Sequence, residues 1–403
     1  TDGTERLTGK ITTRQTGEAE RVTSIDLSGE VAPIFAAEYQ DFFGPETALR
    51  ADIITATDGL RIENLAVDAA ALSLTGEVVL GSDNLPRLID VEGEIASGGT
   101  DPVLLPIAGP ETRVGSVTLD IDFDASQGED WTAIIDVQDI DREGFAAAEV
   151  TLDGTGRIAR DPSTVTAAFD FAARELDLGS EDARAALGEL VSGSTEIVWT
   201  AEQPLRIASL VIDGETYGLE GDATITSGDN GPEIDGTARV RTERLSAFSG
   251  LAGRTLGGEA ELRTNFTAEP LGGFFDVTAT GTTTDLIVSE PRADAILAGE
   301  VTLDLTAARN ETGTRVEIRR LDSPNASVRG QANLRSEGSS LSLSGNVADA
   351  SIILPSVAGP LQITAEASED QGQWTWTTDA GLDGTSLTAS GTATSVLTNP
   401  IIT

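Results

Sequence analysis

The segment "LRIENLAVDAAALSLTGEVVL", residues 60–80, returns in a similar form as "LRIASLVIDGETYGLEGDATI" at residues 205–225. In both copies apolar and polar residues alternate, and alternate side chains of a β-strand share one face. A third, shorter copy, "VEIRRLDSPNASVRGQANL", occupies residues 316–334. Each copy therefore predicts a pair of strands with one apolar and one polar face.

The phase of the alternation changes inside the first copy. Leu60 and Ile62 are out of phase with Leu65 and Val67. An extra residue in a strand shifts the side chains that follow it to the other face, which a β-bulge corrects. We therefore expect a bulge at residues 63–64.

Each copy also carries a Leu in its first run and a Gly in its second, at positions 65 and 76, 210 and 221, and 321 and 330. The third copy is shorter between these two residues, and the difference is even. An even change leaves every side chain on its original face. The three copies are therefore interpreted as one repeated strand pair.

Similar alternation runs almost from end to end of the chain. In "SVTLDIDFDA", residues 116–125, four apolar residues share one face and three aspartates lie on the other. Gly, Asp, Asn and Ser clusters separate such segments and indicate turns. The predicted fold class is all-β: an elongated, repetitive antiparallel sheet curled into an open, β-taco-like trough, with a few short helices at its edges.

Three short helices are expected between the strands. They cover residues 34–43, 180–193 and 244–251. Ser180 is the expected N-cap of the second helix. Glycines often end helices because they adopt positive φ, and Gly44, Gly193 and Gly253 are the expected stops.

The repeats argue for one continuous domain over residues 1–403 rather than several globular ones. Its approximate modules are residues 1–100, 101–180, 181–245, 246–350 and 351–403. The sequence opens "TDGTERLTGK" and ends within an alternating stretch. We therefore expect it to be an internal segment of a longer protein.

Composition excludes several kinds of function. The chain has 26 Lys and Arg against 67 Asp and Glu, a formal net charge of −41, so it should repel nucleic acid. Cys, His and Met are absent. Thiolate and imidazole metal sites and a histidine base are therefore impossible. We predict no catalytic, cofactor-binding or metal-ligating residue, and no enzyme activity.

One motif resembles a dinucleotide site. Gly154, Gly156 and Ala159 match G-x-G-x-x-A after a strand-like run. The site requires a helix to begin there, but Pro162 and a further alternating run follow. We interpret this motif as a tight turn.

Two other features also have structural explanations. Asp120, Asp122 and Asp124 resemble the start of a calcium loop, but Ala125 and Trp131 replace its required Gly and Glu. An outward strand face explains them better. The four tryptophans could form a sugar platform, but their scatter among strands favours core or groove positions; they are Trp131, Trp199, Trp374 and Trp376.

The pattern resembles the TamB branch of the AsmA-like bacterial envelope proteins, also called translocation and assembly module proteins. A short helix, a Gly, a strand, and then L-x-I-x-x-L-x-V and L-x-G-x-x-x-L runs carry the resemblance. The matching stretches are residues 42–80, 107–123, 205–225, 251–266 and 316–334.

The resemblance implies a periplasmic trough that belongs to an inner-membrane-anchored protein. It implies phospholipid transport between the inner and outer membranes and a role in outer-membrane biogenesis and protein assembly. The implied partners are phospholipid acyl chains and an outer-membrane TamA-like barrel protein. We expect the anchor and the regions that dock the TamA-like partner to lie outside this sequence.

The first functional hypothesis is therefore an apolar groove that conducts phospholipid without chemistry. The alternatives are a structural β-solenoid or adhesin-type stalk with a dry core, and a polysaccharide hydrolase on a β-helix. Uneven strand and turn lengths favour the groove. The candidate groove residues are Leu60, Ile62, Leu65, Val67, Leu72, Leu74, Val117, Leu119, Ile121, Phe123, Leu205, Ile207, Leu210, Ile212, Val316, Ile318 and Val328.

Overall fold

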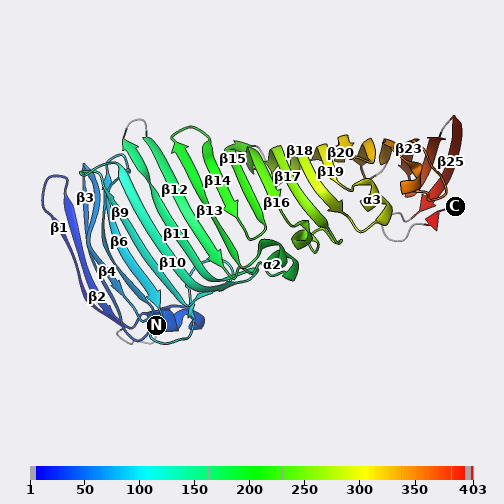
Figure 1. The fold of residues 1–403 in the computed structure, drawn as a ribbon. Coiled ribbons are helices and arrows are strands. Elements are labelled where there is room, and N and C mark those ends of the chain that lie inside the picture. The colour runs from blue at the N-terminus through cyan, green and yellow to red at the C-terminus, as the bar shows by residue number, and fades with distance from the viewer. Residues whose placement is uncertain are drawn as a thin grey trace. The chain divides into compact units, whose positions relative to one another are not determined.

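Antiparallel strands that pair in chain order make up nearly all of the protein in the computed structural model (Figure 1). The structure describes residues 6–160, 163–228, 231–336, 338–382, 384–394 and 401–402. The chain divides into two compact units, Thr1–Gln203 and Pro204–Thr403. The prediction of an all-β fold built from a repetitive antiparallel sheet is confirmed.

In the first unit each strand pairs with the next one, except between β6 and β9. These two pair directly, and the chain between them forms the small β7–β8 hairpin, whose second strand pairs with β10. The strands are β1 (Leu7–Gln15), β2 (Arg21–Gly29), β3 (Thr47–Ala56), β4 (Gly59–Asp68), β5 (Leu72–Gly81), β6 (Pro86–Ala96), β7 (Val103–Leu104), β8 (Thr112–Val114), β9 (Ser116–Asp124), β10 (Asp130–Arg142), β11 (Phe145–Arg160), β12 (Ser163–Arg174) and β13 (Leu190–Thr200).

In the second unit the pairing is strictly sequential. The strands are β14 (Leu205–Asp213), β15 (Tyr217–Gly228), β16 (Gly231–Thr242), β17 (Gly257–Glu269), β18 (Phe274–Ile287), β19 (Glu300–Asn310), β20 (Gly313–Asp322), β21 (Ala326–Leu334), β22 (Ser340–Val347), β23 (Leu361–Asp370), β24 (Gln373–Leu382), β25 (Thr385–Thr394) and β26 (Ile401–Ile402).

Neither unit closes its sheet. Within the described residues no pairing joins β1 to β13 or β14 to β25. The sheets are open and not strongly curled, so the trough expected from the sequence is observed only as an open antiparallel sheet.

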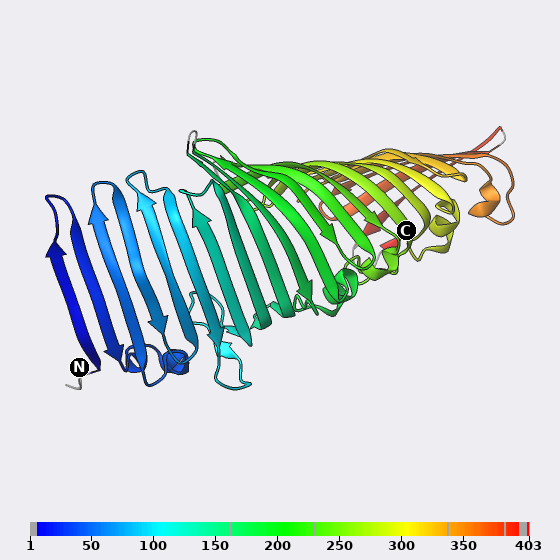
Figure 2. The same ribbon diagram turned by 60° about the vertical axis from the view of Figure 1, so that its left-hand side comes forward.

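Helical turns occur at one end of the strands in each unit (Figure 2). In the first unit they join β2 to β3 and β12 to β13; in the second they join β16 to β17, β18 to β19 and β22 to β23. Because strands alternate in direction, these connections lie along the same edge of each sheet. We call this edge the helical margin and the opposite one, where short hairpins turn, the turn margin. The helical elements are η1 (Ala32–Ile34), η2 (Ala37–Tyr39), α1 (Gln40–Phe43), α2 (Glu181–Leu187), η3 (Leu245–Phe248), α3 (Pro291–Ile296) and η4 (Ala350–Ile352).

The predicted helix at 34–43 is wrong in extent. Phe35 and the residue after it are extended and divide the segment into the short turns η1, η2 and α1. The break allows the Phe35 ring to stack on Phe43, with 3.9 Å between ring centroids. Gly44 ends α1 at φ 67°, as predicted.

Helix α2 begins as predicted but ends early. The Ala183 N–H donates to the Ser180 hydroxyl, which confirms the N-cap. Gly188 ends the helix at φ 81°. The prediction of Gly193 as the stop is wrong, because this residue lies inside β13, opposite Phe171.

The segment 244–251 forms only the 3₁₀ turn η3, and Gly253 follows at φ 62°. Helix α3 and the turn η4 were not predicted. Both are short, so their sequences lack the repeated apolar spacing that would reveal a longer helix.

Two clusters of buried residues lie along the helical margin, whereas Phe123, another buried residue, lies beside the β9–β10 turn. In the first unit Phe42 of α1 packs with Ala71, Val103 and Val114. In the second unit the buried set is Ala326, Val347, Ala350 and Leu361, against which Ile296 of α3 packs. These clusters cover one edge of each sheet.

Candidate functional site: an open apolar face on each unit

Strand register gathers the apolar residues of the first unit on one face. Residues directly opposite each other on antiparallel strands project to the same side. One row of opposite residues crosses from β2 to β12, and all but its single glycine carry apolar side chains. It consists of Leu27, Leu49, Val67, Leu74, Gly93, Leu119, Ile135, Leu152 and Phe171.

The second unit has an apolar face of its own. A row of opposite residues crosses from β14 to β25, and all but its glycines carry apolar side chains. It consists of Ile207, Ala223, Gly236, Phe266, Val277, Ala307, Val316, Ala332, Leu341, Ala367, Trp376 and Gly391.

A β-bulge keeps the first copy of the repeat in phase. The pairing of β4 with β5 shifts between Ile62 and Leu65. Within the bulge Asn64 has φ 53°, a conformation that Asn tolerates better than most residues, and its side-chain amide donates to Asp52 over 2.9 Å. The prediction of a bulge at residues 63–64 is confirmed.

The other two copies carry the same irregularity. The register shifts between Ile207 and Leu210 in β14, and between Ile318 and Leu321 in β20. In all three copies the strand gains one residue between its two apolar runs. The bulge is thus part of the repeated unit.

Because of these bulges, every candidate groove residue lies on the apolar face of its own unit. Phe123 is buried at 2% exposure, and the others are half-buried. The first unit holds Leu60, Ile62, Leu65, Val67, Leu72, Leu74, Val117, Leu119, Ile121 and Phe123. The second holds Leu205, Ile207, Leu210, Ile212, Val316, Ile318 and Val328.

Away from the helical margin most of each face is uncovered. In the described part of the chain, substantial strand contacts join only neighbours within a sheet, and helical elements touch only the margin. Large apolar side chains stay accessible on the faces: Trp199 is 42% exposed, Leu341 43% and Leu387 67%. A single sheet layer therefore presents apolar surface that no second layer hides.

The opposite face of the first unit is acidic. Glu77 faces Asp90, which faces Asp122, and Glu92 faces Asp120 in the next row. Like charges placed opposite one another repel, so they are tolerated where water screens them. Asp120 and Asp122 are exposed, as an outward strand face requires.

Asp124 has a different role from these two aspartates. Its carboxylate accepts hydrogen bonds from the Ser126 N–H and the Gln127 side chain. Hydrogen bonds from the Ser126 and Gln127 side chains, followed by the Ser126 N–H, lower its pKa. It therefore caps the β9–β10 turn. Among the described residues no group of three or more acidic side chains is arranged to hold a metal ion.

The interpretation of the G-x-G-x-x-A motif as a turn is wrong. Gly154 and Gly156 lie inside β11, opposite Ala133 and Trp131 of β10. A Cβ at Gly154 would lie 2.8 Å from the Phe169 ring, and one at Gly156 would lie 2.7 Å from the Trp131 indole nitrogen. These glycines make room for large rings on the apolar face.

The tryptophans belong to the apolar faces. Trp131 packs near Phe169, with ring centroids 5.9 Å apart. Trp199 lies on the same face of the first unit, and Trp374 and Trp376 lie on the apolar face of the second. Their placement fits the predicted groove positions better than a closed core.

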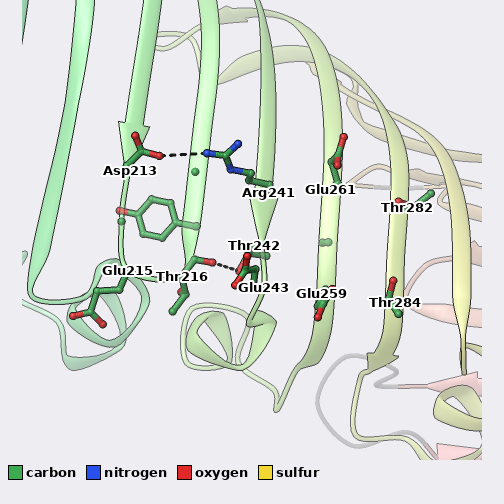
Figure 3. A pocket seen from close by; sticks show the side chains of 14 residues that line it. Asp213, Glu215, Thr216, Arg241, Thr242, Glu243, Glu259, Glu261, Thr282 and Thr284 are labelled. Atoms are coloured by element: carbon green, nitrogen blue, oxygen red, sulfur yellow. Dashed lines mark hydrogen bonds and ion pairs between the residues drawn. The ribbon is translucent and has the colours of Figure 1, made fainter.

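A depression of about 490 Å³ lies beside the start of β15 in the second unit (Figure 3). Its polar lining includes Asp213, Glu261 and Arg241. The Arg241 guanidinium lies 3.5 Å from Asp213 and 3.6 Å from Glu220, so carboxylates already neutralise it. The depression is shallow, and its acidic side chains lie beside an arginine whose charge is already neutralised.

Tyr217 also lines this depression. Its hydroxyl is buried without a hydrogen-bond partner, and burial raises its pKa. Its ring packs against Phe248 of η3, edge to face, with centroids 5.9 Å apart. A phenol whose pKa is raised stays protonated, so the geometry suits packing better than proton transfer.

The chain matches no protein-family model, no curated protein and no solved structure. In the described residues, no helix combines the length and the hydrophobicity that spanning a bilayer requires. Inferences about function therefore rest on the two apolar faces.

Proposed function

We propose that this protein binds the acyl chains of phospholipids along its apolar faces and catalyses no reaction. The observation that supports this proposal most strongly is the set of apolar rows that crosses each sheet without a covering layer. A sheet that exposes so much apolar surface to water needs a guest or a partner to cover it. A lipid chain is such a guest.

The energetics suit a mobile guest. Burial of a methylene contributes about 0.8 kcal/mol, and a chain lying on an open face buries about half of its surface. A chain of about 14 carbons would therefore gain roughly 6 kcal/mol before entropic costs. This attraction is non-directional, so no single position holds the chain tightly.

We place this activity in the periplasm, in a TamB-like protein that carries phospholipid between the inner and outer membranes and supports outer-membrane protein assembly. The resemblance of the repeats to that family supports this location and role. A TamA-like partner and an inner-membrane anchor would engage regions outside this sequence. The proposal does not require a curled trough. It requires only an open apolar face that is covered along one edge.

Site-specific photo-crosslinking in cells tests this proposal. A photoreactive residue replaces Ile121 or Ile207 on the apolar faces, with Asp122 and Arg206 as matched neighbours on the opposite faces. We expect phospholipid adducts at the two apolar positions and few at the controls. Equal labelling at all four positions, or none at the apolar pair, would favour the structural stalk instead.

A further inference from the structure

Charged side chains reach the apolar faces at the turn margin. Arg21 does so in the first unit, and Arg309 and Glu369 do so in the second. Glu369 accepts backbone N–H bonds from Gly338, Ser339 and Gly372. One of these three charges is therefore satisfied by hydrogen bonds within its own turn.

The other two are not. Neither Arg21 nor Arg309 forms an ion pair or side-chain hydrogen bond within the described residues, and both are exposed. Their distinction is their place on the apolar face, because other arginines that lack an ion pair in the described part of the chain, such as Arg14 and Arg315, lie on the opposite face. An unpaired guanidinium beside apolar rows is suited to an anionic ligand group.

The two arginines have matching surroundings. Arg21 lies opposite Thr55, which lies opposite Leu60, on β2, β3 and β4. Arg309 lies opposite Thr314, which lies opposite Leu334, on β19, β20 and β21. Each unit thus presents one Arg–Thr–Leu row on the apolar face at its turn margin, where guanidinium and hydroxyl donors stand beside an apolar side chain.

We propose that each Arg–Thr–Leu row binds the phosphate of a lipid head group whose acyl chain lies along the apolar face. This inference rests on the proposed function and adds the head group to it. The guanidinium and the Thr hydroxyl donate to phosphate oxygens, and the Leu contacts the start of the chain. The net charge of −41 favours a zwitterionic head group over a net anionic one.

The dimensions of the face agree with this arrangement. From Arg309, β19 runs through Ala307 and Leu305 to Val301, which is fully buried at the helical margin. That distance is about 27 Å at about 3.4 Å per residue. One leaflet of a bilayer core is about 15 Å thick, half of about 30 Å. An acyl chain anchored at the turn margin therefore fits before the covered edge.

Binding of two amphiphiles with the same tail tests the inference. Dodecylphosphocholine and dodecyl maltoside are titrated into the full chain by equilibrium dialysis, below their micelle-forming concentrations. We expect the phosphate-bearing amphiphile to bind about fivefold more tightly. The double variant Arg21→Gln/Arg309→Gln should remove this preference and leave binding of the maltoside unchanged.

The control variant is Arg14→Gln/Arg315→Gln. These two exposed arginines lie on the opposite faces of neighbouring strands, and their loss changes net charge equally. An equal loss of preference in this control would overturn the inference, as would inorganic phosphate competing as well as the amphiphile. Equal binding of both amphiphiles would refute the head-group site alone, whereas binding of neither would refute the proposed function as well.

Discussion

Replacing Ile121 with Glu separates an open lipid face from a dry core. Ile121 lies between Val91 and Ala133 in an apolar row and is half-buried. Full burial of an Ile side chain stabilises by about 1.5–3 kcal/mol, so half-burial contributes about 0.8–1.5 kcal/mol. On an open face the new carboxylate stays hydrated, and we expect the free energy of unfolding to fall by about 1–2 kcal/mol.

Lipid binding should respond much more strongly than stability. An acyl chain that crosses the Ile121→Glu position must displace water from an ionised carboxylate, which costs several kcal/mol. We therefore expect at least about tenfold weaker binding of the amphiphile that lies across β9, with most of the folding stability retained. Urea unfolding and equilibrium dialysis measure the two quantities on the same protein.

Phe123 gives the reference cost of a substitution at a buried position on the same strand. It lies two residues further along β9, opposite Ile89 and Trp131, and is 2% exposed. Phe123→Ala should cost about 3–5 kcal/mol, as a buried position does. If Ile121→Glu costs as much as Phe123→Ala, Ile121 is enclosed and the reasoning for an open face is refuted.

Three further outcomes follow from local geometry. Gly156→Ala should destabilise the fold by about 2–4 kcal/mol, because its Cβ would lie 1.9 Å from a backbone oxygen. The control Gly98→Ala has open space around it and should leave the stability unchanged. Urea unfolding measures both. Asn64→Val should cost about 1–2 kcal/mol at φ 53°, and Asn64→Gly should cost less; equal losses would contradict a conformational cause. Hydrogen bonds, first from the Ser351 backbone N–H, lower the pKa of Asp349. The ionised carboxylate should stabilise the fold at pH values above the ordinary carboxyl pKa. This stabilisation should be lost as the pH falls through the lowered pKa of Asp349 in the folded protein. Asp349→Asn should flatten this acid dependence in thermal melts.

The strands could be predicted from the sequence because their signal is local. Alternation with a period of two identifies a half-buried strand without knowledge of its neighbours. The bulge at residues 63–64 was predictable for the same reason, since a change of phase within one strand is visible in that strand alone. The candidate groove residues followed from the same alternation.

Features that depend on neighbouring strands could not be predicted. Gly154 and Gly156 match a turn motif, but rings from β10 and β12 determine their role. Likewise, Arg309 and Thr314 become opposite partners only once the register of β19 and β20 is known. The helical margin was missed in part because its turns are too short to show a period.

The difference between the two margins bears on how many ligands each unit can carry. A closed tube can take up a ligand only at its ends, so its ligands must enter one after another. A sheet that is covered along one edge and free along the other can be loaded from the side at any strand. Adjacent strands lie about 4.8 Å apart, so neighbouring chains could lie side by side across the sheet. Titration of either unit with a lipid should therefore saturate at several bound molecules rather than at one.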